Sequence, residues 1–339
     1  MKKKIIYAVL ALLLLTGAYL GWQVSGPTVQ APEGKYFYIK TGSTYEEVRA
    51  DLLDQHIIGN AYFFDLLARQ ARYKNNVRAG RYEIKKGMSL LRLVRMLRAG
   101  QQSPVNFVIT KLRTREDLAQ RIAASFETDS ATVINFLNNK DSLQAYHLDS
   151  NTVMTAVIPN TYAILWNTPV NRIFRKLYNE REKFWTPERQ QLAAAKNMTP
   201  LQVYTMASIV EEETNKEEDK GNIASVYINR VKAGQRLEAD PTIKFALRNF
   251  GLKRIRKVHI DACATSPYNT YYAAGLPPGP ICTPSSKTID AVLNAPATNY
   301  LFFVARPDWS GLSNFTESYT EHMENARKYQ RFLDSINIK

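Results

Sequence analysis

The stretch TPLQVYTMASIVEEET, residues 199–214, predicts a helix with one buried face. Thr199 is a typical N-cap, Pro200 fits the first helical position and Gln202 completes a capping box, so the start of the helix is well specified. With about 100° between successive residues, the apolar side chains at 203, 206, 207 and 210 share one arc. That arc sets the expected direction of the acidic residues that follow.

Three consecutive carboxylates end this helix, and its phase predicts three different environments. Glu211 points toward the buried, aromatic side, Glu212 toward water and Glu213 toward the opposite flank. A carboxyl placed like Glu211 loses hydration of its charged form and can hold a proton near neutrality, as a general acid acting on an ether-like oxygen must. The alternative is structural: Glu211 pairs with an arginine such as Arg230 and only ties two helices together.

The N-terminus is typical of a single membrane anchor. Residues 1–4 read MKKK, a cytoplasmic tail, and residues 5–22 form an uncharged run rich in Leu, Ala and Val. This run is about long enough to span the hydrocarbon layer, with the lysines left in the cytoplasm. A cleaved signal peptide is the competing interpretation, but the run exceeds the usual ~7–15 residues and no Ala-x-Ala site follows it. The absence of a nearby Cys excludes a lipoprotein signal.

A polar linker with Pro and Gly, residues 23–34, leads into a small module at residues 35–102. The pattern predicts, in order, a strand at 36–39, a helix from a capping box at 43–46 to about 55, a helix at 61–73 and a strand at 80–84. After them Arg92, Arg95 and Arg98 recur every three residues opposite a Leu stripe. Such a stripe indicates a solvated helix flank or a surface that meets membrane or wall.

The rest of the chain predicts a connecting α/β segment at residues 103–156 and a larger domain at 157–339. The larger domain combines long helices with a Pro/Gly-rich segment at 266–284, a strand near 300–304 and a closing helix at 319–336. The predicted fold class is therefore α+β: an N-terminal transmembrane helix, a small βααβ module and a larger mixed domain. Its long irregular segment is the kind of place where function is often found.

The formal net charge of +14 favours acidic partners. Residues 33–117 alone hold 16 Lys/Arg against 9 Asp/Glu, a net of +7. No nucleic acid is expected for a chain exported from the cytoplasm, so we favour acidic wall polymer or anionic lipid headgroups. A generic basic surface without a specific partner is the plain alternative.

No motif predicts a metal or a cofactor. The four histidines lack zinc-ligand spacing, and the sequence has no Gly-rich phosphate loop and no GxSxG elbow. The two cysteines, Cys263 and Cys282, form one disulfide in an oxidising compartment or remain unpaired buried thiols.

Five motifs in the C-terminal half resemble, in order, the motif series of the endolytic murein transglycosylase family (MltG/YceG-like). They are ASIVEEET at 207–214, ASVYINR at 224–230, LEADPT at 237–242, SPYNTY at 266–271 and GLPPGPI at 275–281. The resemblance extends to the single N-terminal anchor and to a LysM-like module in the position of the predicted βααβ unit.

The resemblance implies a reaction and a place for it. Such enzymes cleave the β-1,4 bond between N-acetylmuramic acid and N-acetylglucosamine in nascent glycan strands and leave a 1,6-anhydro end. Glu211, the first acidic residue of the IVExET motif, is implied as the acid/base, with the C6 hydroxyl of the sugar replacing the second carboxylate of ordinary glycosidases. The resemblance also implies a single-pass protein of the inner (cytoplasmic) membrane, a catalytic domain in the periplasm, and peptidoglycan synthases as partners.

Further motif positions are expected to bind sugar or to orient Glu211, with ordinary packing hydrogen bonds as the alternative. These positions are Glu213, Asn229, Asp240, Tyr268, Asn269 and Thr270. Two positions depart from the family pattern: Asn160 stands where an acidic residue is common, and Ser313 stands where a His-x-Phe begins. No role is carried over to either.

Two other functions stay open from the sequence. A non-catalytic peptidoglycan-binding scaffold of the wall-synthesis machinery would use the module and the basic face without chemistry. A lysozyme-type hydrolase would add water and produce reducing ends.

Overall fold

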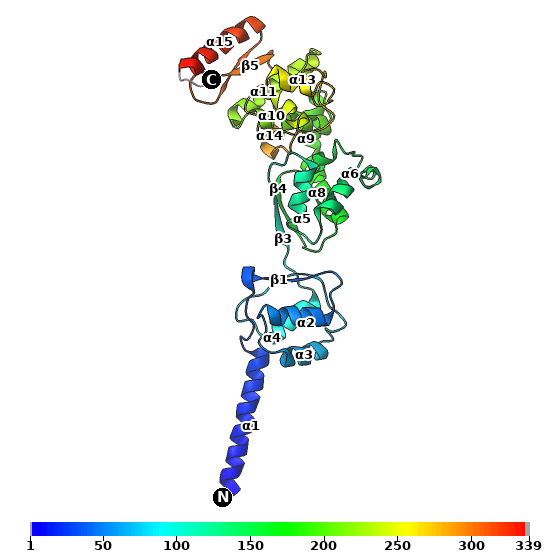
Figure 1. Ribbon diagram of the computed structural model, residues 1–339, viewed down its shortest axis with the longest axis vertical. Coiled ribbons are helices and arrows are strands. Elements are labelled where there is room, and N and C mark those ends of the chain that lie inside the picture. The colour runs from blue at the N-terminus through cyan, green and yellow to red at the C-terminus, as the bar shows by residue number, and fades with distance from the viewer. Residues whose placement is uncertain (1, 336–339) are drawn as a thin grey trace. The chain divides into compact units, whose positions relative to one another are not determined.

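The computed structural model describes residues 2–335, which fold into two compact units (Figure 1). Unit 1 contains the residues up to 107 together with 125–128 and 163–169, and unit 2 contains the remainder. Strands β3 (Val105–Ile109) and β4 (Asn160–Ile164) pair as a two-stranded sheet, and the unit boundary falls inside both strands.

Unit 1 begins with α1 (Lys2–Ser25), the one helix within residues 2–335 that is long and apolar enough to cross a membrane. None of its side chains is buried, although Val24, near its end, packs against the core of unit 1. The length and composition fit the predicted anchor, and they fit a signal sequence equally well.

The rest of unit 1 has the predicted order of strand, helix, helix and strand. Strand β1 (Tyr36–Ile39) pairs antiparallel with β2 (Gly80–Glu83), and α2 (Tyr45–Asp54) and α3 (Ala61–Gln70) lie between them in sequence. The capping box of α2 uses Thr44 and Glu47, one residue later than the spacing 43–46 predicts. The arginine stripe falls on α4 (Leu90–Ala99), where all three side chains are exposed.

The segment predicted as a linker packs against unit 1. Val29 is 0% exposed and forms an isolated β-bridge with Met88, and the amide of Gln30 donates to the carbonyl of Ile57. A short 3-10 helix, η1 (Glu33–Lys35), then leads into β1. Pro and Gly therefore mark irregular backbone here, but the backbone is ordered by the core of the unit.

Unit 2 is mainly helical. Its first part contains α5 (Arg115–Ala123), α6 (Ser130–Asn138), α7 (Lys140–Gln144), η2 (Val153–Ala156), α8 (Val170–Phe184) and α9 (Pro187–Ala195). Its second part contains α10 (Pro200–Glu213), α11 (Glu217–Lys232), α12 (Asp240–Ala246), α13 (Lys257–Ala262) and α14 (Ser286–Leu293). The described chain closes with β5 (Phe302–Ala305), β6 (Ser313–Thr316) and α15 (Tyr319–Ser335).

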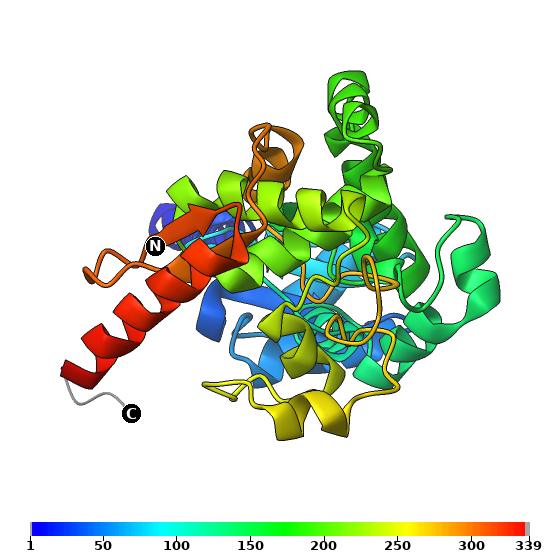
Figure 2. The ribbon, with the colours of Figure 1, turned by 90° about the horizontal axis from the view of Figure 1, so that it is seen from above.

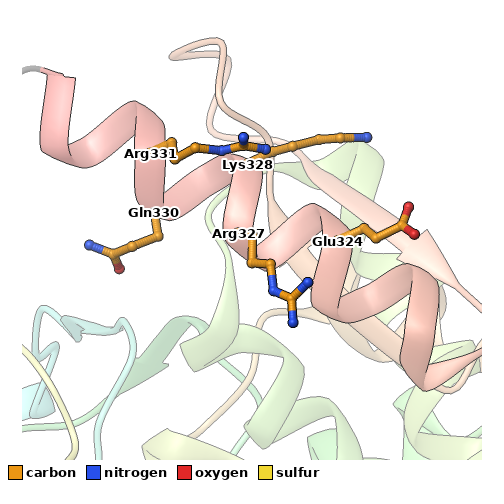
Figure 3. Close-up of a pocket in the computed structure, with 5 residues that line it drawn as sticks. All are labelled: Glu324, Arg327, Lys328, Gln330 and Arg331. Atoms are coloured by element: carbon orange, nitrogen blue, oxygen red, sulfur yellow. The ribbon is translucent and has the colours of Figure 1, made fainter.

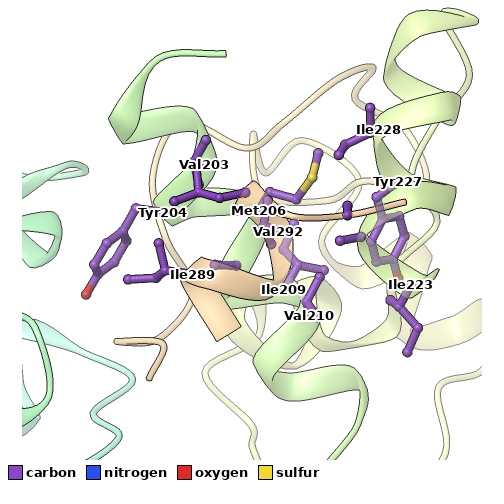
Figure 4. Packing of buried hydrophobic residues seen from close by; sticks show 14 of the residues in the cluster. Val203, Tyr204, Met206, Ile209, Val210, Ile223, Tyr227, Ile228, Ile289 and Val292 are labelled. Carbon is purple, nitrogen blue, oxygen red and sulfur yellow. The ribbon is translucent and has the colours of Figure 1, made fainter. Parts of the chain in front are cut away.

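Helix α10 is the centre of the core of unit 2. Thr199 and Gln202 form the predicted capping box. Every residue from 203 to 210 is buried, because α9, α11, α12, α14 and η2 all pack against the helix (Figure 4). The expectation of a single buried face is therefore wrong, since a helix enclosed on all sides has no solvent face from which to read its phase.

Strands β5 and β6 form an antiparallel hairpin, with Phe303 opposite Phe315, and α15 lies alongside it (Figure 2). The hairpin also packs against α11 through β5. Cys263 and Cys282 are both buried and unpaired, so the second alternative for the cysteines holds.

Candidate active site

Glu213 ends α10 at the point where the helix leaves the core. The hydroxyl of Tyr227, a buried residue of α11, donates to Oε1 of Glu213 at 2.6 Å. Removal from water raises the pKa of Glu213 from 4.5 to about 7; the charge of Asp240 adds to this effect, and the Tyr227 hydrogen bond opposes it. Glu213 can therefore exchange a proton near neutral pH, which is the requirement for a general acid and base.

A second carboxylate, Asp240, begins α12 next to this site. The hydroxyl of Tyr271 donates to Oδ1 of Asp240 at 2.6 Å. Each of the two acids thus accepts a hydrogen bond from one tyrosine, which fixes the direction of its carboxylate.

Both acids line a cavity of about 300 Å³. Its other lining residues are Tyr227, Arg230, Leu237, Glu238, Tyr271, Phe302, Phe303 and His322. The combination of aromatic faces with a few polar groups suits a ring that carries hydroxyl and amide substituents.

Arg230 and His322 add nitrogen-bearing side chains to the cavity wall. Arg230 Nη1 donates to the Leu237 carbonyl at 3.0 Å and pairs with Glu238 at 3.1 Å, so Arg230 is not the partner that the structural alternative gave to Glu211. His322 stacks on Phe302 with centroids 5.2 Å apart, and its Nδ1 has no hydrogen-bond partner among residues 2–335. Burial, and then the charge of Arg230, lower the pKa of His322, which favours the neutral form of its imidazole.

Glu211 is not among the residues that line this cavity. Its Oε2 accepts from Lys220 Nζ at 3.4 Å, from Ser285 Oγ at 3.2 Å and from the Thr288 hydroxyl. The Lys220 side chain is 4% exposed and that of Glu211 16%. Together these contacts form a polar cluster that ties α10 to α11 and α14.

The helix phase predicts that Glu212 points to water, and this prediction is wrong. Glu212 pairs with Lys111 Nζ and with Arg113 Nη2, both at 3.0 Å, and its side chain is 13% exposed. The physical reason is the enclosure of α10, which leaves no open side for the middle acid.

Asn229 has structural partners for both hydrogens of its amide. Nδ2 donates to the carbonyls of Thr298 at 2.8 Å and Tyr300 at 3.0 Å. These contacts fasten α11 to the segment before β5, and Asn229 is absent from the residues that line the cavity. The packing alternative is the one that the geometry favours for this residue.

Asn269 and Thr270 are also occupied by the fold and buried, at 0% and 1% exposed. Asn269 Nδ2 donates to the Ile260 carbonyl at 2.8 Å, and Thr270 Oγ1 accepts from the Ala239 amide at 3.0 Å. They hold the loop that presents Tyr271, so a positioning role fits them better than contact with sugar.

Tyr268 lies at a different, smaller cavity of about 60 Å³, with Arg113, Arg115 and Arg248 among its lining residues. Its ring packs on Phe245 with centroids 4.7 Å apart. Of the predicted substrate-binding residues, the structure thus brings together Glu213 and Asp240 and places the other four elsewhere.

The two positions that depart from the family pattern are also outside the cavity lined by Glu213. Asn160 is exposed at the start of β4, and its Oδ1 accepts from the amide of Thr161 at 2.7 Å. Ser313 is buried in β6, and its amide donates to Asp219 Oδ2 at 2.7 Å.

A larger cavity of about 570 Å³ lies along α15 and lacks the features of a catalytic site. All five of its lining residues come from this one helix, and Figure 3 shows them spread along it instead of converging. Four are Arg327, Lys328, Gln330 and Arg331, and the only acid is Glu324.

Sequence reasoning missed most of the cavity wall. Tyr227 and Tyr271 lie inside the quoted motifs, and that position is a signal that could have identified them. Phe302, Phe303 and His322 follow much later in the sequence, and no local pattern connects them to Glu213.

Comparison with known proteins gives one family. The model of the YceG-like family matches residues 37–328. A Streptococcus pneumoniae (serotype 2, strain D39) protein named endolytic murein transglycosylase is 27% identical over 372 residues, which cover 98% of this chain and 65% of that protein. This chain therefore spans less than two thirds of the length of the pneumococcal relative.

A Bacillus subtilis (strain 168) protein of the same name is 26% identical over 311 residues, which cover 86% of this chain and 83% of that protein. The crystal structure of a yceG-like protein from Listeria monocytogenes superimposes with a TM-score of 0.56 at 26% identity, covering 85% of this chain and 98% of the other.

Proposed function

This chain belongs to the YceG-like family, and from that membership we propose that it is a lytic transglycosylase that cleaves peptidoglycan glycan strands. Relatives named endolytic murein transglycosylase support the reaction class. The single observation that carries the proposal is the aromatic cavity in which Glu213 has a pKa of about 7.

We assign the acid/base role to Glu213, whereas the sequence resemblance predicts Glu211 for it. A general acid must reach the glycosidic oxygen and hold a proton at working pH. Glu213 lines the cavity and meets the second condition, while Glu211 accepts from the buried ammonium of Lys220 outside that cavity. We give Glu211 a positioning role, because its cluster fixes α10 against α11 and α14.

The reaction needs one acid that acts twice. Glu213 donates its proton to the bridging oxygen as the bond from that oxygen to C1 of N-acetylmuramic acid breaks, which frees the 4-hydroxyl of N-acetylglucosamine. The C6 hydroxyl of the muramic acid then bonds to C1 and returns its proton to Glu213. The product is a 1,6-anhydro end, and no water is consumed.

The neighbouring groups support this sequence. The Tyr227 hydroxyl holds the Glu213 carboxylate in place after proton transfer. The negative charge of Asp240, which lines the same cavity, favours the positive charge that develops at C1.

A hydrolase of the lysozyme type is the second candidate function. The observation that favours it is Asp240, a second carboxylate in the same cavity as Glu213. Two carboxylates permit either a nucleophile or a base for water. The masses of the products separate the two reactions, because an anhydro end weighs one water less than a reducing end.

We further propose that α1 anchors the chain in the cytoplasmic membrane as a single pass, with unit 2 on the periplasmic side. The apolar length of α1 and the lysines that precede it support this topology. The LysM-like character of residues 35–102 and an association with peptidoglycan synthases belong to the same proposal.

The test is mass spectrometry of peptidoglycan strands digested with the purified full chain and with two isosteric variants. Glu213→Gln should reduce the formation of anhydro ends by at least about 100-fold, because it removes the exchangeable proton. Glu211→Gln should retain activity within about tenfold once stability is matched, because it changes a positioning group.

The reverse ranking of the two variants would return the catalytic role to Glu211. If the parent chain releases no anhydro ends, the lyase proposal is wrong, and reducing ends in their place would establish the hydrolase. If neither product is released, the non-catalytic peptidoglycan-binding scaffold is the function that remains.

A further inference from the structure

An exposed apolar stripe on α3 indicates a second contact of unit 1 with its surroundings. Tyr62, Leu66 and Arg69 stand at positions i, i+4 and i+7 and therefore share one face of the helix. Tyr62 is 67% exposed and Leu66 49%. The opposite face is buried and carries Phe63, Phe64, Leu67 and Ala68. Since a helix face in water normally carries polar residues, Tyr62 and Leu66 have an uncovered apolar surface that calls for a partner.

The contact between α3 and α1 sets the depth of this stripe. The rings of Tyr19 in α1 and Phe63 in α3 meet edge to face, with centroids 6.5 Å apart. Tyr19 and Trp22 are the last aromatic residues of α1, and Tyr and Trp near the end of a spanning helix lie in the interfacial layer. The first turn of α3 is therefore held at the level of the lipid headgroups.

The length of α1 gives the same level. From Ile5 to Trp22 the helix rises about 27 Å, close to the thickness of the hydrocarbon core. With Lys4 at the cytoplasmic edge, Trp22 reaches the outer edge of that core. Tyr19, which contacts α3, is less than one helical turn before Trp22 and therefore lies next to the same boundary.

A cavity of about 240 Å³ opens beside the same contact. Its wall combines the polar residues Gln23, Thr28 and Asn60 with the apolar ring of Phe63. A mixed lining of this kind at membrane level suits the glycerol and phosphate region of a phospholipid.

We propose that the α3 face formed by Tyr62, Leu66 and Arg69 lies in the interfacial layer of the bilayer that α1 enters, in contact with phospholipid headgroups. The ring of Tyr62 and the side chain of Leu66 lie at the boundary with the acyl chains, and the Arg69 guanidinium reaches lipid phosphate. The inference rests on the proposed membrane anchor and is independent of the reaction in unit 2. Two attachments fix the orientation of unit 1 at the membrane, whereas α1 alone leaves it free to rotate.

The test uses full-length chains in nanodiscs of phosphatidylcholine and phosphatidylglycerol, with brominated acyl chains as quencher. Single cysteines replace Tyr62, Leu66, Lys40 or Leu12 and carry an environment-sensitive fluorophore. Lys40 is exposed directly after β1, and Figure 1 shows β1 at the end of unit 1 away from α1; Leu12 lies in the middle of α1. The parent chain, whose two cysteines are buried, measures background labelling.

Quenching at positions 62 and 66 should exceed that at position 40 by at least about twofold. Strong quenching at position 12 with equal, weak quenching at 62, 66 and 40 would leave the anchor standing and overturn the α3 contact. Blue-shifted emission at 62 without quenching would assign the stripe to a protein partner and also overturn it. Glycan cleavage by the same labelled chains is a separate readout, so failure of the enzyme proposal is distinguished from failure of the membrane contact.

Discussion

At the scale of single residues, the three adjacent glutamates have the same side chain and differ in their neighbours. Glu211 accepts from Lys220, Glu212 pairs with two cations, and Glu213 accepts from the neutral hydroxyl of Tyr227. Only Glu213 combines a place in the aromatic cavity with a proton that it can exchange near pH 7. The chemistry of a carboxylate at the end of a helix thus depends on tertiary contacts that its sequence position does not reveal.

The raised pKa of Glu213 has a consequence for stability. Its pKa moves from 4.5 to about 7, so the protonated acid contributes stability below about pH 4.5, and this contribution is lost as the pH rises through about 7. Glu213→Gln, which cannot ionise, should therefore be more stable than the parent above about pH 8, by roughly 1–3 kcal/mol. Thermal unfolding across the pH range measures the difference, which should vanish toward acidic pH.

Glu211→Gln is the matched control, because it makes the same chemical change two positions away. It weakens the contacts of the buried Lys220 and should lower stability at neutral pH by about 1–3 kcal/mol. Equal destabilisation by both variants above pH ~8 would contradict a raised pKa at Glu213.

A substitution of Tyr227 tests the role of the Glu213 carboxyl through the rate of glycan cleavage. The Tyr227 hydroxyl holds down the pKa of Glu213, so Tyr227→Phe should raise that pKa and move the alkaline limb of the pH–rate profile upward by about 1 pH unit. The rate of anhydro-end formation as a function of pH measures the shift. A variant that loses stability but keeps the limb in place would limit Tyr227 to a structural role.

At the scale of elements, the features that could be predicted were those that neighbouring residues in the sequence determine. The start of α10 follows from Thr199, Pro200 and Gln202, and the exposed arginine stripe of α4 follows from a three-residue repeat. The phase of α10 could not be predicted, because a helix surrounded by five other elements is buried on every side. Amphipathic reasoning assumes a solvent face, and it failed where that face is absent.

Asn229 tests the link between α11 and the segment before β5. Asn229→Ala leaves the carbonyls of Thr298 and Tyr300 without their amide donor, which should cost about 1–3 kcal/mol of unfolding free energy. The KM for glycan should stay within about twofold, because the side chain does not line the cavity. Denaturant unfolding and steady-state kinetics give the two numbers.

Asn222→Ala is the control, since Asn222 is a half-buried asparagine of the same helix. It should change stability by less than about 0.5 kcal/mol. If Asn229→Ala instead unfolds like the parent and raises KM more than about tenfold, Asn229 binds sugar, as the motif resemblance suggested.

At the scale of the molecule, the proposed site is assembled from segments far apart in the sequence. The end of α10 supplies Glu213, the start of α12 supplies Asp240, and β5 and α15 supply Phe302 and His322. Glu213 and Asp240 both lie within the motifs in residues 207–281, where the resemblance predicts residues that bind sugar or orient Glu211. The hairpin and α15 carry no motif that points to the cavity, so the wall they form becomes visible only once the chain is folded.

The topology of the whole chain gives the last prediction. If Lys2, Lys3 and Lys4 hold the N-terminus in the cytoplasm, protease added to spheroplasts should digest unit 2 while a tag placed before Lys2 stays protected. Replacing the three lysines by serine removes the positive charge that holds the N-terminus in the cytoplasm. The fraction of chains whose unit 2 is digested should then fall, because both orientations of α1 become possible. Digestion of the N-terminal tag in the parent chain would place unit 2 in the cytoplasm, away from peptidoglycan. Cleavage that removes the first residues and releases the chain would identify α1 as a signal sequence.

Either of these results would also remove the basis for the membrane contact of α3. Protection of the tag would instead place the cavity of Glu213 on the side of the membrane where its proposed substrate is found.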